Sequence, residues 1–74
     1  IIMSRLPSLS GKELIKVLNK IGYHAIRQRS SHIRLSCPHK KSVTVPDHKI
    51  LGRGLLRKIL RDTELSIKDF QNLL

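Results

Sequence analysis

One segment of the chain, RQRSSHIRLSC at residues 27–37, sets a histidine among side chains that bind anions. Histidine is a side chain that can exchange a proton near neutral pH, which the arginines around His32 cannot do readily. Arg27, Arg29 and Arg34 carry the positive charge that holds a phosphodiester and stabilises charge developing on its oxygens. An RNA 2′-hydroxyl can attack its own phosphate when a base takes its proton, positive charge stabilises the phosphate oxygens and the RNA backbone is bound. The alternative is a bystander histidine on a basic surface.

The charge balance points to a polyanionic partner. Fifteen Lys and Arg residues face five Asp and Glu residues, for a net charge of +10. Residues 12–61 hold thirteen basic residues and only two acidic ones, Glu13 and Asp47, whereas the segment from Asp62 onward is slightly acidic. A small basic domain of this kind most often binds nucleic acid. A basic protein without such a partner is the alternative, and no amphipathic anchor favours a membrane surface.

Several other chemistries lack the residues they need. None of the four histidines shows the paired short spacing of a structural metal site with another histidine or with Cys37, so we expect no metal and no small-molecule cofactor. The Gly-Arg-Gly at 52–54 is too short for a phosphate loop of the Walker type. Tyr23 and Phe70 are the only aromatic side chains apart from histidine, too few for a sheet that stacks RNA bases.

The intracellular setting is inferred from simple features. A single cysteine excludes an internal disulfide framework and fits a reducing compartment. No segment has the length and apolarity of a membrane-spanning helix, and no signal peptide is visible. We therefore expect a cytoplasmic protein.

Residues 9–22 are predicted to form a helix. Ser10 and Glu13 have capping-box spacing, and Gly22 is a natural stop. Further helices are expected at 55–62, where apolar and basic residues alternate with helical period, and at 66–74, where Ser66 and Asp69 repeat the capping spacing. The inner face of the first helix is formed by Leu14, Val17, Leu18 and Ile21.

Between the first two helices, apolar residues recur with a period of two, which predicts strands near 23–28, 32–37 and 42–46. Matching their inner faces sets the register of the second and third strands. Continued backward, the alternation puts Ile26 on the inner face and Arg27 beside His32 on the outer one. The predicted cross-strand pairs are Leu35 with Val43, Ile33 with Val45, Arg34 with Thr44, and His32 with Pro46.

The order of helix, three-stranded antiparallel sheet and helices indicates an α+β fold whose helices cover one sheet face. The other face stays open and carries Arg27, His32, Arg34, Ser36 and Thr44. We expect an extension over residues 1–9, a domain over 10–65, and a short helix over 66–74 that packs on the same domain.

Three segments together resemble the HicA toxins of toxin–antitoxin modules. They are LSGKELIKVLNKIGY, RQRSSHIRL and VTVPDHKILGRGLLRKILRDTELS, and the match covers most of the chain, about residues 10–66. The resemblance implies a double-stranded-RNA-binding-domain-like fold, metal-independent cleavage of mRNA, and inhibition by a HicB-like antitoxin. The chain departs from the family pattern at Ser30, where glycine is usual. Glycine would adopt the positive φ of a turn there at little cost.

Carried over to this chain, the resemblance implies that His32 is the catalytic residue and that Ser31 precedes it in the site. Together with the basic residues around the sheet, the expected RNA-binding set is Arg27, Arg29, Ser31, Arg34, Lys40 and Lys41. His48 matches the histidine after the Val-Pro pair and is either an accessory acid–base group or a loop residue. The expected partners are mRNA and the antitoxin, and the alternative function is a non-catalytic RNA-binding module on the same fold.

Overall fold

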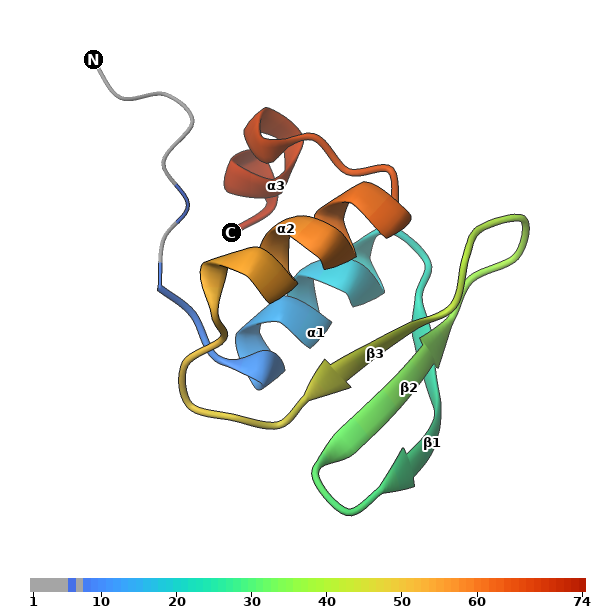
Figure 1. Ribbon diagram of the computed structural model, residues 1–74. Helices are drawn as coiled ribbons and strands as arrows, with labels where there is room; N and C mark the ends of the chain where they lie inside the picture. Colours follow the sequence, from blue (N-terminus) through green and yellow to red (C-terminus); the bar gives the residue numbers. More distant parts are fainter. Residues whose placement is uncertain (1–5, 7) are drawn as a thin grey trace.

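The computed structural model describes residue 6 and residues 8–74 of the chain. The elements follow the predicted order, and the α+β arrangement resembling a double-stranded-RNA-binding domain is confirmed (Figure 1). The elements are α1 Gly11–Lys20, β1 His24–Arg29, β2 His32–Ser36, β3 Val43–Pro46, α2 Arg53–Asp62 and α3 Ile67–Leu73.

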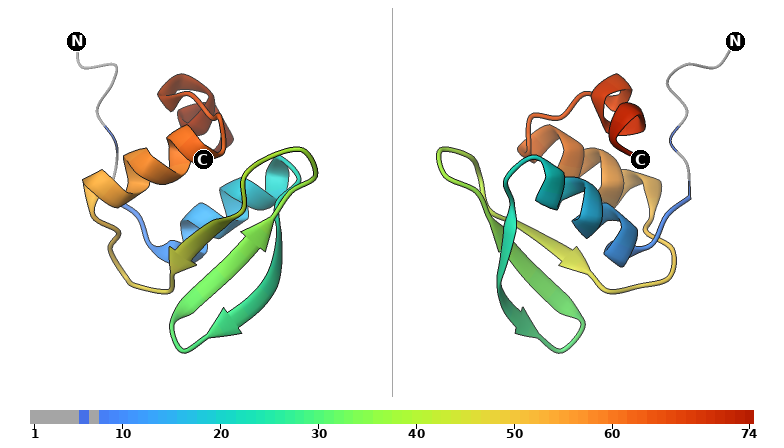
Figure 2. Two further views of the ribbon diagram at one scale, coloured as in Figure 1. Left: turned by 45° about the vertical axis from the view of Figure 1, so that its right-hand side comes forward. Right: turned by 180° about the vertical axis from the view of Figure 1, so that it is seen from behind.

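The three strands form one antiparallel sheet in the order β1-β2-β3. Both α1 and α2 contact β3, and α3 packs against α1. Figure 2 shows the helices on one side of the sheet and the β1–β2 hairpin extending past them. The helices therefore cover one sheet face around β3 and leave the opposite face open.

The core lies between the helices and the covered sheet face. Burying each leucine, isoleucine or valine side chain there stabilises the fold by about 1.5–3 kcal/mol relative to leaving it exposed. Tyr23 and Phe70 are both fully buried, so neither aromatic ring is available on the open face. The other buried side chains include Leu14, Val17, Leu18, Leu35, Val43, Val45, Leu56, Ile59 and Leu60.

The predicted capping box starts α1. The Ser10 hydroxyl accepts a hydrogen bond from the Glu13 N–H at 3.1 Å, and the Glu13 carboxylate accepts one from the Ser10 N–H at 2.8 Å. The bond from the Ser10 backbone, with that from its side chain, lowers the pKa of Glu13. At the next position, a Cβ on Gly11 would overlap the backbone carbonyl oxygen of Pro46, so only glycine fits where α1 meets the end of β3.

The predicted register of β2 and β3 is confirmed at all four pairs, but the placement of β1 is wrong in part. A bulge between Ala25 and Arg27 inserts one extra residue, so the regular alternation does not continue backward. Ile26 is 60% exposed instead of facing the core. Arg27 shares the open face with His32, as predicted, but the direct partner of His32 is Arg29 and that of Arg27 is Arg34.

The last helix is capped and held at its end. The Ser66 hydroxyl accepts a hydrogen bond from the Asp69 N–H at 3.0 Å, as the sequence predicts. The Lys20 ammonium of α1 donates to the Leu73 carbonyl oxygen at 2.6 Å.

Among the helices that the structure describes, none has the length and apolar character needed to cross a membrane.

Candidate functional site

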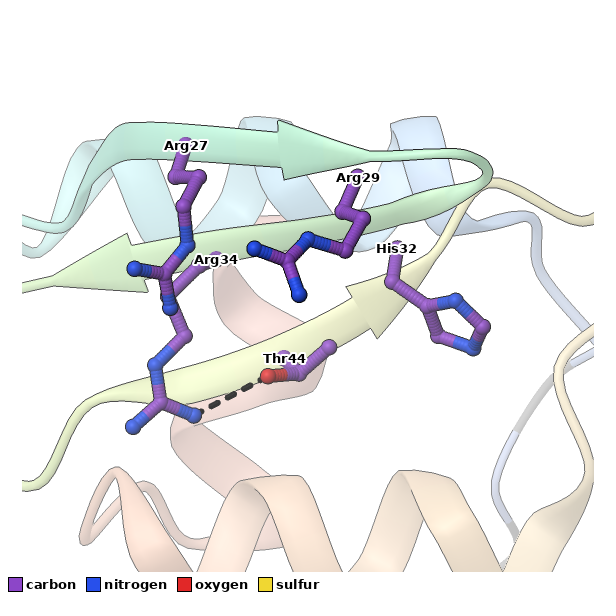
Figure 3. Close-up of a pocket in the computed structure, with 5 residues that line it drawn as sticks. All are labelled: Arg27, Arg29, His32, Arg34 and Thr44. Atoms are coloured by element: carbon purple, nitrogen blue, oxygen red, sulfur yellow. Dashed lines mark hydrogen bonds between the residues drawn. The ribbon is translucent and has the colours of Figure 1, made fainter.

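A shallow pocket of about 110 Å³ lies on the open face of the sheet (Figure 3). Every strand contributes to it, because cross-strand neighbours on one face of a sheet stand side by side. Three of its side chains are arginines that the sequence predicted to bind RNA. The residues that line the pocket are Arg27, Arg29, His32, Arg34 and Thr44.

Two cross-strand rows build this pocket. One row runs from Arg27 through Arg34 to Thr44, and the other pairs Arg29 with His32. Arg29 and His32 flank the two-residue turn between β1 and β2, and a turn of that length makes its flanking residues direct partners. The register at the site is therefore set by the turn.

The arginines lack acidic partners. Within the described part of the chain the ion pairs found all involve Asp62, so no carboxylate neutralises Arg27, Arg29 or Arg34. Like charges directly opposite each other destabilise a sheet. The side-chain hydrogen bond found at the cluster among the described residues runs from the Arg34 guanidinium to the Thr44 hydroxyl at 2.9 Å. The pocket thus gathers uncompensated positive charge suited to an anionic ligand.

The His32 side chain is exposed at the edge of the pocket. Within the described residues the imidazole has no hydrogen-bond partner. Figure 3 shows the Arg29 guanidinium between the other two arginines and His32, whose ring is turned away from them toward the end of β3. The imidazole therefore lies at the edge of the arginine cluster.

The backbone that carries His32 is held more firmly. The Asp47 N–H donates to the Ser31 carbonyl oxygen at 2.6 Å, which ties the β1–β2 turn to the segment after β3. The Gln28 side chain donates to the Ser30 carbonyl oxygen at 3.1 Å. Ser30 itself has φ of 56°, in the left-handed region that favours glycine. Sequence reasoning flagged this position, and the turn does require positive φ there.

Lys40 and Lys41 do not line the pocket. They lie in the loop between β2 and β3 and contact the end of α2. The Lys40 ammonium donates to the Thr63 carbonyl oxygen at 3.3 Å, and the Lys41 ammonium lies 4.0 Å from the Asp62 carboxylate. A hydrogen bond from Lys58 lowers the pKa of Asp62, with a smaller contribution from Lys41, so that carboxyl stays ionised. Both loop lysines are thus engaged away from the three arginines.

A metal centre is not evident from the residue arrangement. The described residues contain no group of three or more His, Cys, Asp or Glu side chains placed to hold a metal ion. Cys37 is half-buried and packs against the core.

A family model for the HicA toxin of bacterial toxin–antitoxin matches residues 11–65. The chain belongs to the HicA toxin family. HicA toxins generally cleave RNA and act with an antitoxin partner, and the matched span contains every residue of the pocket. No curated protein and no solved structure matches the chain.

Two residues of this HicA chain have contacts that the sequence pattern does not predict. Thr44 lies on the open face, as the register predicts, and its hydroxyl accepts the hydrogen bond that orients Arg34 in the pocket. The carbonyl oxygen of His48 accepts a hydrogen bond from the Gly11 N–H at 2.9 Å, which holds the loop without using the imidazole. This contact uses the main chain alone, so the role of the His48 imidazole stays a prediction.

Replacing Ser30 by the usual HicA glycine is expected to stabilise the chain. A residue with a side chain loses roughly 1–2 kcal/mol of stability when its backbone is in the left-handed region. Glycine avoids this cost, but its greater backbone freedom in the unfolded state offsets part of the gain. We expect Ser30→Gly to raise the free energy of unfolding by about 0.5–1 kcal/mol, measured by urea denaturation. The matched control is Ser31→Gly in the same turn, where φ is not positive and glycine should destabilise. Equal changes in the free energy of unfolding for Ser30→Gly and Ser31→Gly would contradict a backbone cost at Ser30.

Proposed function

We propose that the chain is an endoribonuclease that binds mRNA on the open sheet face and cleaves it without a metal ion, with His32 as its acid–base residue. The observation that carries the proposal is the pocket lined by His32 and by three arginines that have no acidic partner among the described residues. The pocket is far smaller than the sites that enclose small organic ligands, which span about 300–1,000 Å³. A phosphate group of a polymer whose remainder extends outside fits such a shallow site.

The proposed reaction uses the RNA as its own nucleophile. The 2′-oxygen forms a bond to the adjacent phosphorus while the bond from phosphorus to the 5′-oxygen breaks, leaving a 2′,3′-cyclic phosphate and a 5′-hydroxyl. His32 takes the proton from the 2′-hydroxyl while water protonates the departing 5′-oxygen, or it protonates the 5′-oxygen while water takes the 2′-proton. The guanidinium groups of Arg27, Arg29 and Arg34 stabilise the charge that builds on the phosphate oxygens.

Outside the pocket, the remaining predicted residues take supporting parts in this proposal. Ser31 lies directly before His32 and, through its carbonyl oxygen, sets the position of the turn that RNA must contact. Lys40 and Lys41 add to the long-range attraction of RNA, but their contacts with the end of α2 leave them a smaller share of direct binding.

The antitoxin is proposed to be HicB-like and to cover the same face. An acidic surface laid over the arginines would attract this basic chain quickly and occupy the phosphate site. Burying His32 in the same contact would remove the acid–base group from solvent. RNA and antitoxin should therefore compete.

The RNA-cleavage proposal is tested by blocking the nucleophile. The purified chain should cut a single-stranded transcript in EDTA, and the products should end in 2′,3′-cyclic phosphate. The same sequence with 2′-O-methyl groups should bind but remain intact, because its 2′-oxygen has no proton to lose. Binding without cleavage of several unmodified transcripts would leave the RNA-binding module as the function, and cleavage of the methylated strand would rule out this mechanism.

Direct phosphate binding by the pocket arginines is tested through salt dependence. Each phosphate contact to a single strand contributes about 0.7 to the slope of log affinity against log salt. We expect Arg27→Gln to weaken binding of the 2′-O-methyl strand and to reduce the slope by about 0.7. The control Lys41→Gln removes the same charge beside Asp62 and should leave the slope nearly unchanged. A larger loss of slope for Lys41→Gln than for Arg27→Gln would place the RNA near α2.

A further inference from the structure

Strand β1 is an open edge of the sheet. The strand order is β1-β2-β3, and no other described strand pairs with the outer side of β1. All six of its residues are exposed, whereas β2 and β3 each contain buried residues. Because the hairpin extends past the helices, no helix covers this edge (Figure 2). Such an edge presents unpaired N–H and C=O groups that can bind another strand.

The side chains along this edge restrict which strand can bind there. Arg27 and Arg29 stand on the open face, and Ile26 at the bulge is 60% exposed. A second copy of the chain would bring like charges together along this edge. A strand with acidic side chains meets opposite charge, and an apolar side chain of that strand can cover Ile26.

We propose that the antitoxin binds by adding an extended, acidic segment beside β1 as a fourth strand of the sheet. This inference rests on the proposed inhibition by an antitoxin and specifies how that partner docks. Side chains of an added strand alternate between the two faces, so every second one stands on the open face beside Arg27 and Arg29. Main-chain hydrogen bonds would then supply affinity while the acidic side chains fill the phosphate pocket.

Hydrogen exchange of the complex with the antitoxin from the neighbouring gene tests this docking mode. In the free chain, only the amides of residues 24–29 that bond to β2 should exchange slowly. In the complex, the outward-pointing amides of this segment should slow as well. If the complex inhibits RNA cleavage while those amides still exchange freely, strand addition is wrong and the proposed function stands. If it neither inhibits cleavage nor covers His32, the proposed mode of inhibition fails.

A pair of variants provides a second readout. Ile26→Gln should weaken antitoxin binding by about tenfold, because it removes an apolar side chain that the added strand would bury. Leu74→Gln alters a side chain that is similarly exposed, 57%, but lies on the helical side, and it should leave affinity unchanged. Equal affinities of the two variants would overturn the proposal. So would protection of residues 24–29 that rises with concentration of the chain alone, since the edge would then bind a second copy.

Discussion

Electrostatic repulsion among three arginines is the constraint on which the candidate site depends. Arg27 stands directly opposite Arg34, Arg29 lies beside them, and no described carboxylate compensates any of the three. The chain has acidic residues, but the single one in α2, Asp62, pairs with Lys41 and Lys58 instead. Like charges on neighbouring strands repel each other. The proposed phosphate ligand would neutralise that repulsion.

The fold keeps that cluster exposed while holding its backbone in place. The helices bury the opposite face of the sheet, chiefly at β3. The open face, which carries the pocket, therefore contributes little to the core. The segment after β3 then links the turn before His32 to the start of α1. Its N–H at Asp47 bonds to Ser31, and its carbonyl at His48 accepts from Gly11. The approach of Gly11 to Pro46 is too close for any side chain, so the same junction limits how far the turn can shift.

Local patterns in the sequence were sufficient for most of the fold. The capping box of α1 and the alternation in β2 and β3 each involve residues near one another in the chain, and both predictions are confirmed. Ile26 was misplaced because a bulge leaves no signature in simple alternation, although the two-residue turn already required Arg29 to face His32. The positions of Lys40 and Lys41 depend on a contact with α2 some twenty residues later, which period and spacing do not reveal.

The central claim is that His32 transfers the proton during RNA cleavage. Its most direct test is the single-turnover rate of cleavage in EDTA for His32→Ala and for His24→Ala, which changes an exposed histidine of β1 that does not line the pocket. RNA affinity is measured alongside with the uncleavable 2′-O-methyl strand. We predict that His32→Ala lowers the rate by roughly 10²–10⁴-fold with nearly unchanged affinity, while His24→Ala cleaves like the unmodified chain. A His32→Ala variant that cleaves at the rate of the unmodified chain would contradict the assignment.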